Sequence, residues 1–185
     1  MDASQQRKLA QKVVKQTARN MKPFGYSLTK SMFLCREYPH LIAFFHFHKR
    51  RIGPCFRMHF GIRVLSSSFD AQHLNGPCIT DAGWYGEDDA SVSRCAQALT
   101  ALLIREGLPW IESWLDPQKL ISDSGGPLTE ADRASLRSAL EGKLEAEHVA
   151  LSYNLFGMTP LNPASAVDGG IPLQSNSGTP LPRRH

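Results

Sequence analysis

The stretch "CFRMHFGIRVL", residues 55–65, alternates between two kinds of side chain. One set is apolar and comprises Phe56, Met58, Phe60, Ile62 and Val64, while the positions between them hold Cys55, Arg57, His59, Gly61 and Arg63. A period of two places successive side chains on opposite faces of a strand. We therefore predict a strand over residues 55–65 with one face in a core and the other in water.

The period of two continues upstream of this stretch. It predicts strands over residues 26–35 and 40–48, broken by Glu37-Tyr38-Pro39 and by a turn around residues 51–54. Both breaks are short enough for antiparallel hairpins. The sequence thus predicts an antiparallel meander of three or more strands.

A helix is predicted before the meander, because Leu9, Val13, Thr17 and Met21 recur at helical spacing. At 100° per residue the opposite quadrant holds only cations, which are Lys8, Lys12, Lys15, Arg19 and Lys22. We expect an amphipathic helix over residues 3–21 with a cationic outer face.

The chain after the meander favours further helices. Residues 66–89 read as irregular, residues 92–104 as a helix, and residues 110–115 as a short amphipathic segment. We predict an α+β fold in which an N-terminal helix, the meander and C-terminal helices on one sheet face form a core domain over residues 1–122. A Gly-rich break over 123–128, an amphipathic helix over 129–156 and a disordered tail over 157–185 complete the organisation.

The charge is distributed unevenly. The chain has 185 residues and a net charge of +4. Residues 1–65 carry 13 Lys and Arg against Asp2 and Glu37, a net charge of +11, whereas residues 66–128 carry a net charge of −6. We expect a bipolar molecule whose basic face, formed by the helix cations together with Lys49, Arg50 and Arg51, binds a partner.

A second candidate surface is the acidic and aromatic stretch "DAGWYGEDD" at residues 81–89. Its candidate contact residues are Trp84, Tyr85, Glu87 and Asp88. Paired carboxylates beside aromatic rings also suit general acid and base chemistry on a sugar. We favour helix capping by Asp88 and Asp89, because a long apolar-periodic segment follows them directly.

Three histidines are candidates for a metal site. In the predicted register His46 and His48 share the polar sheet face with Arg57 and His59, and three imidazoles can bind zinc. The neighbouring cations disfavour a dication, and carboxylates that would orient the rings are missing nearby. We therefore expect a face that is solvated or covered by a helix, with no metal and no cofactor.

Motifs of the common enzyme classes are missing from the sequence, which has no Walker loop, no G-x-S-x-G and no H-E-x-x-H. The first residues, MDASQQRKLA, lack the layout of a signal peptide, and no apolar run is long enough to span a bilayer. We expect a cytoplasmic protein without membrane contact.

Four segments follow one another as in a known family: "FGY" at 24–26, "MFLCRE" at 32–37, "HFGIRVL" at 59–65 and "GLPWIESWLDP" at 107–117. Over about residues 3–121 the chain resembles a bacterial family of unknown function, the domain numbered forty-three-oh-four. The resemblance implies a small α+β domain with a binding role such as toxin neutralisation. One departure is the basic first third, since proteins that neutralise nucleases commonly present acidic surfaces.

Three functions from different classes follow. The first is a non-catalytic protein-binding module, such as an immunity protein that blocks a bacterial toxin or effector. The second is a nucleic-acid-binding protein that uses the basic helix face. The third is a metal-dependent hydrolase with His46, His48 and His59. The sequence leaves the oligomeric state open.

Overall fold

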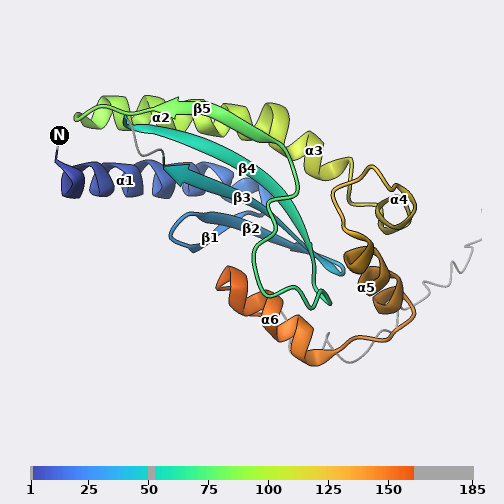
Figure 1. Ribbon diagram of the computed structural model, residues 1–185. Helices are drawn as coiled ribbons and strands as arrows, with labels where there is room; N and C mark the ends of the chain where they lie inside the picture. The colour runs from blue at the N-terminus through green and yellow to red at the C-terminus, as the bar shows by residue number, and fades with distance from the viewer. Residues whose placement is uncertain (1, 50–52, 161–185) are drawn as a thin grey trace, which may run out of the picture.

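The computed structural model describes residues 2–49 and 53–160. Its strands are β1 (Ser27–Lys30), β2 (Phe33–Tyr38), β3 (Leu41–Lys49), β4 (Cys55–Val64) and β5 (Cys78–Trp84). Its α-helices are α1 (Ala3–Met21), α2 (Asp89–Leu102), α3 (Leu108–Glu112), α4 (Pro117–Ser122), α5 (Glu130–Leu140) and α6 (Ala146–Phe156). The strands form one antiparallel sheet in the order β1-β2-β3-β4-β5 (Figure 1). This arrangement confirms the predicted α+β fold with an N-terminal helix and a meander.

The register between β3 and β4 matches the predicted one. Phe45 pairs with Phe60, and His46 pairs with His59 in the next position. Since paired residues share a face, the alternation of β4 places the apolar set on one face and His59 with its neighbours on the other.

The strand boundaries differ from the predicted ones at two places. The stretch predicted as one strand over 26–35 is a hairpin, because Ser31 and Met32 form a turn between β1 and β2. The strand β5 lies in a segment that was predicted to be irregular. Its pairing with β4 contains a register shift, and Asp81 has a φ of 54°. The sequence of an irregular strand such as β5 does not show the regular alternation of apolar and polar residues.

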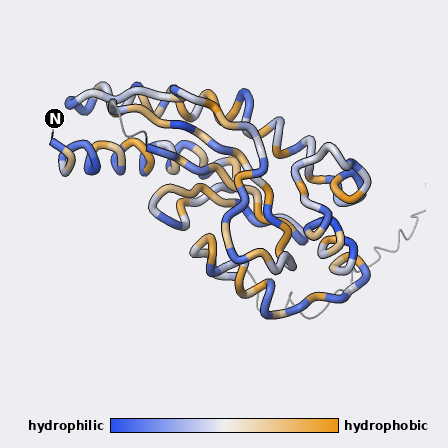
Figure 2. Tube along the Cα trace, viewed as in Figure 1, coloured by the Kyte–Doolittle hydropathy of each residue, from blue (hydrophilic) through white to orange (hydrophobic). Residues whose placement is uncertain are grey.

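The main core lies between one sheet face and the helices α1 and α2. The predicted stripe of α1 is buried, and Val13 and Met21 are fully enclosed. On the sheet, Phe45 stacks against Tyr26 with ring centroids 4.7 Å apart. Figure 2 shows hydrophilic residues recurring along α1 between the hydrophobic ones, as expected of an amphipathic helix.

The helix predicted over residues 92–104 and the short segment predicted over residues 110–115 are not separated by a break. The chain continues through a π-helical turn, Leu103–Gly107, directly into α3. A Cβ atom on Gly107 would lie 2.8 Å from the Phe45 ring. Glycine at this position therefore lets the helix approach the sheet closely.

The opposite sheet face, which was predicted to be wet, is partly covered by α6. Ile42 and Phe44 are buried there with Tyr153 and Phe156. The rings of Phe44 and Phe156 lie 4.8 Å apart. The C-terminal helices thus pack on both faces, since α2 shares the face of α1 and α6 takes the other (Figure 1).

The segment predicted as one helix over 129–156 is two helices, α5 and α6. The chain turns between them at Gly142, which has a φ of 79°. Leu136 of α5 joins the main core, so both helices dock on their own chain. Of the predicted tail, residues 161–185 lie outside the described residues.

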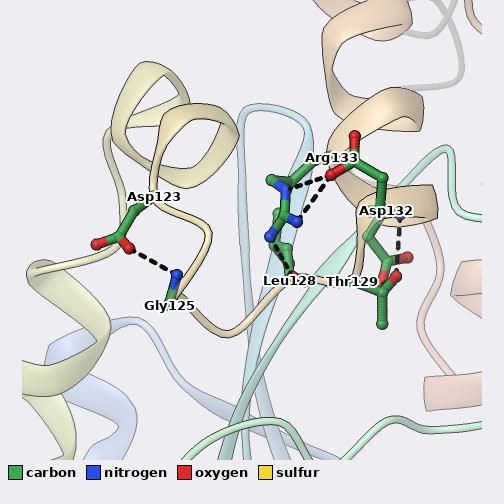
Figure 3. Close-up of polar contacts among 7 residues, drawn as sticks. Asp123, Gly125, Leu128, Thr129, Asp132 and Arg133 are labelled. Carbon is green, nitrogen blue, oxygen red and sulfur yellow. Dashed lines mark hydrogen bonds and ion pairs between the residues drawn. The ribbon is translucent and has the colours of Figure 1, made fainter.

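The Gly-rich break before α5 is held by local hydrogen bonds (Figure 3). Gly125 N donates to Asp123 Oδ1 across 2.9 Å, and Arg133 Nη1 donates to the Leu128 carbonyl across 2.7 Å. Asp132 N donates to Thr129 Oγ1 across 3.1 Å. Thr129 is therefore the N-cap of α5.

Candidate partner-binding surface

The cations of the first helix form one exposed surface, which we call the cationic ridge and which comprises Lys8, Lys12, Lys15, Arg19 and Lys22. Successive members lie three or four residues apart, or about 5 Å along the helix. The helix contains no acidic residue. The ridge faces away from the core because the opposite stripe of α1 packs on the sheet and on α2.

The ridge meets the acidic start of α2 through an ion pair. Lys12 Nζ lies 2.9 Å from Asp89 Oδ1, and both side chains are largely exposed. Such a pair contributes less than about 1 kcal/mol to stability. The pair matters for the surface and not for stability, because it brings residues 77 positions apart in the sequence together.

Asp88, the residue before Asp89, is the N-cap of α2, which confirms its predicted capping role. Its Oδ1 accepts a hydrogen bond of 2.6 Å from Ser91 N at the first turn of α2. The second carboxylate, Asp89, lies in that first turn, where it complements the helix dipole. Neither role removes the negative charge from the surface.

Of the two aromatic candidates, Trp84 is exposed and Tyr85 is not. Trp84 has an exposed fraction of 56% and lies against Gly53, at which a Cβ atom would be 3.1 Å from the indole ring. Tyr85 packs on Phe56 with ring centroids 5.4 Å apart, and burial raises the pKa of its hydroxyl to about 12. Tyr85 is therefore a core residue and is removed from the contact residues.

These observations join the two predicted surfaces into one. We call it the composite surface, and it comprises the cationic ridge, Glu87, Asp88 and Asp89. Trp84 is not part of it, because its partner Cys55 lies on the sheet face that points away from α1 and α2. The N-terminal ends of α1 and α2 lie side by side in Figure 1, with β5 leading into α2. Lys49 is half-buried at the end of β3, and Arg50 and Arg51 lie outside the described residues.

The three candidate histidines lie together on the sheet face that α6 leaves open. The ring centroids of His46, His48 and His59 are 5.9 to 6.4 Å apart. Burial, followed by repulsion from the other two rings, lowers the pKa of His46 to about 4. Within residues 2–49 and 53–160, no three His, Cys, Asp or Glu side chains are arranged to hold a metal ion.

A groove that the sequence did not reveal lies between the loop after β4 and the start of α5. Its volume is about 460 Å³, and its lining includes Ser67, Phe69, His73 and Asp132. Ser67 Oγ donates to Asp132 Oδ1 across 2.7 Å, so this serine and carboxylate already satisfy each other. The groove joins segments about 60 residues apart, and only tertiary contact reveals it.

None of the helices in the described parts of the chain is long and apolar enough to cross a membrane. Comparisons with known protein families, with curated proteins and with solved structures gave no match. The resemblance to the family numbered forty-three-oh-four therefore stays a prediction.

Proposed function

We propose that this chain is a non-catalytic protein-binding module and that the composite surface is its contact site. The observation that carries the proposal is the Lys12–Asp89 pair, since it brings the cationic ridge and the acidic start of α2 onto one surface. Exposed side chains of both signs on one surface favour a protein partner of complementary charge.

The charge pattern defines the partner. The ridge extends over about 21 Å, from Lys8 to Lys22, and matches an acidic stripe on another protein. The acidic residues beside the ridge are Glu87, Asp88 and Asp89. We therefore expect the partner to carry a cationic patch next to its acidic stripe. Toxin neutralisation is the specific form that we propose, in which the module covers the active site of a bacterial effector with an acidic surface there.

A nucleic acid is the second candidate, because one cation at each helical turn also suits phosphate contacts. The acidic border argues against it. Asp88 and Asp89 lie beside the ridge and would repel a phosphate backbone that follows α1 past its first turns.

The test is capture of the partner from the native lysate, with and without nuclease, followed by binding measurements on the purified pair. Exchanging two ridge cations, Lys8→Glu with Lys15→Glu, should weaken binding at least tenfold at 150 mM salt. The matched control is Arg137→Glu with Lys143→Glu, which makes the same charge change on exposed positions of α5 and the loop after it.

Two results would contradict the proposal. Equal losses in the ridge and control variants would show that net charge, and not this surface, governs binding. Capture that disappears with nuclease would assign the ridge to nucleic acid instead.

A further inference from the structure

The open half of the second sheet face begins where α6 ends. Phe156, the last residue of α6, packs on Phe44 and Phe33, and the next residues of β3 on this face are His46 and His48. His46 is half-buried against Phe33, with ring centroids 4.3 Å apart, whereas His48 is exposed. This region is separate from the composite surface, and its role does not depend on the proposed function.

Two cross-strand pairs place four nitrogen-bearing side chains together here. His46 pairs with His59, and His48 pairs with Arg57. We call the four residues the histidine–arginine cluster. Its rings are 5.9 to 6.4 Å apart, which is too far for direct hydrogen bonds. An acceptor that lies beside two of the rings, off the line between their centroids, can accept an N–H···O bond of about 2.9 Å from each.

Two polar atoms of the cluster are buried without a partner. Neither His46 Nδ1 nor Arg57 Nε has a hydrogen bond in the structure. Buried polar groups are nearly always paired in folded proteins, so each unpaired one calls for an explanation, and a bound water or ion is one that suits a donor on an exposed sheet face. Both atoms belong to neighbouring residues of the same cluster, so a single ligand can account for them.

The local charges favour an anion. Burial lowers the pKa of His59, and the positive charges of Arg57 and His48 lower it further. The charges that lower the pKa of His46 are also positive, from His48 and His59.

The other strands contribute two carboxylates to this face, Asp81 on β5 and Glu37 on β2, and Glu37 accepts from the Tyr153 hydroxyl across 2.8 Å beneath α6. On β5, the Cys78 thiol lies 3.6 Å from His59 Nε2, and Asp81 accepts from the Cys55 thiol. On β1, Lys30 adds a cation, which bonds to the Leu155 carbonyl at the end of α6. The cluster therefore places three imidazoles beside one guanidinium, and the pKa values of His46 and His59 are lowered there.

We infer that the histidine–arginine cluster binds a tetrahedral oxyanion, the phosphoryl group of a ligand. An arginine fork and several ring N–H groups supply the donors that such an oxyanion needs. A bound dianion would also offset the repulsion among the rings, so binding should be accompanied by proton uptake.

The first probe is inorganic sulfate, titrated into the full chain by calorimetry at low ionic strength. Sulfate stays a dianion between pH 5.5 and pH 8, so a change in affinity reports on the protein alone. We expect one sulfate per chain, with affinity at least tenfold higher at pH 5.5 than at pH 8, and ring resonances of the three cluster histidines that shift together in NMR spectra.

Two variants test the assignment to the cluster. Arg57→Gln should weaken sulfate binding at least tenfold, and the exposed His48→Gln keeps the test valid if the first variant does not fold. Arg94→Gln is the control, because this arginine is exposed on α2. Sulfate binding that survives both cluster variants, or that shifts none of the three rings, would overturn the inference, as would a zinc-specific shift of the rings without any effect of sulfate.

Two further probes distinguish the source of the phosphoryl group. Adenosine monophosphate represents a nucleotide, and a phosphoserine peptide represents a modified protein. If the inference is right, one of them binds more tightly than sulfate and loses affinity in Arg57→Gln.

Discussion

Arg63 on β4 donates from Nε to the hydroxyl oxygen of Ser152 on α6 across 2.7 Å, and both side chains are buried. The same guanidinium donates to the carbonyl oxygens of Ser67 and Phe69, at 2.9 and 2.8 Å. Ser152 in turn donates to the Leu65 carbonyl across 2.8 Å. One arginine therefore holds the loop after β4 and the last helix on the second sheet face.

We predict that Arg63→Met destabilises the protein by about 2–4 kcal/mol, because several buried carbonyl oxygens lose their donor. Equilibrium unfolding in urea measures the change. The control is Arg94→Met at an exposed position, which should change stability by less than about 0.5 kcal/mol. Equal effects of the two variants would show that the Arg63 network does not hold α6.

Gly61→Ala should destabilise the protein by about 1–3 kcal/mol, as overpacked cores do. A Cβ atom at Gly61 would lie 2.1 Å from the Phe44 ring, which α6 covers. The matched control is Gly125→Ala, where the nearest atom is 3.4 Å away. Thermal unfolding of both variants checks the prediction, which fails if Gly61→Ala melts at the control's temperature.

Two substitutions at Asp88 separate its capping role from its charge. Asp88→Ala removes the bond to Ser91 N and should cost about 1 kcal/mol, whereas asparagine is as good an N-cap and Asp88→Asn should cost only a few tenths. Urea unfolding measures both. In the partner-binding assay we expect the two variants to lose similar affinity, since both remove the charge; full affinity in Asp88→Asn would exclude the charge from the interface.

As the pH is lowered from about 6.5 to 4, the free energy of unfolding of the protein should decrease. The pKa of His46 is about 4 in the folded state, below the ordinary value of 6.5. Above pH 6.5 the ring is neutral in both states, and as the pH falls the unfolded chain binds the proton first. We expect a loss of roughly 1–2 kcal/mol from this ring, after allowance for solvent screening of a partly exposed group.

The variant His46→Phe keeps a ring against Phe33 and removes the titration. It should flatten the dependence of unfolding free energy on pH in this range. The control His73→Gln changes an exposed histidine in the loop after β4 and should leave the slope intact. An unchanged slope in His46→Phe would assign the acid sensitivity to other groups.

Local patterns in the sequence determined the helix α1, the strands β3 and β4 and the side-chain faces of these two strands, but not β5, the β1–β2 hairpin or the break between α5 and α6. The alternation around Phe60 and the helical spacing of Val13 are short-range properties of the chain, because each residue's side follows from backbone geometry alone. The capping roles of Asp88 and Thr129 also follow from residues three positions away. The sequence also contains an indication that part of the second sheet face is covered. Ile42 and Phe44 are apolar, although the other residues of β3 on this face are polar.

Tertiary structure alone decided which distant segments meet. The Lys12–Asp89 pair joins two surfaces that the sequence presents as separate, and α6 reaches the sheet only because the chain turns at Gly142. The sequence predicted Arg63 on a solvated strand face and Tyr85 on a contact loop, but both residues are buried. Whether a side chain is covered depends on what packs over it from elsewhere in the chain, and no local period encodes that.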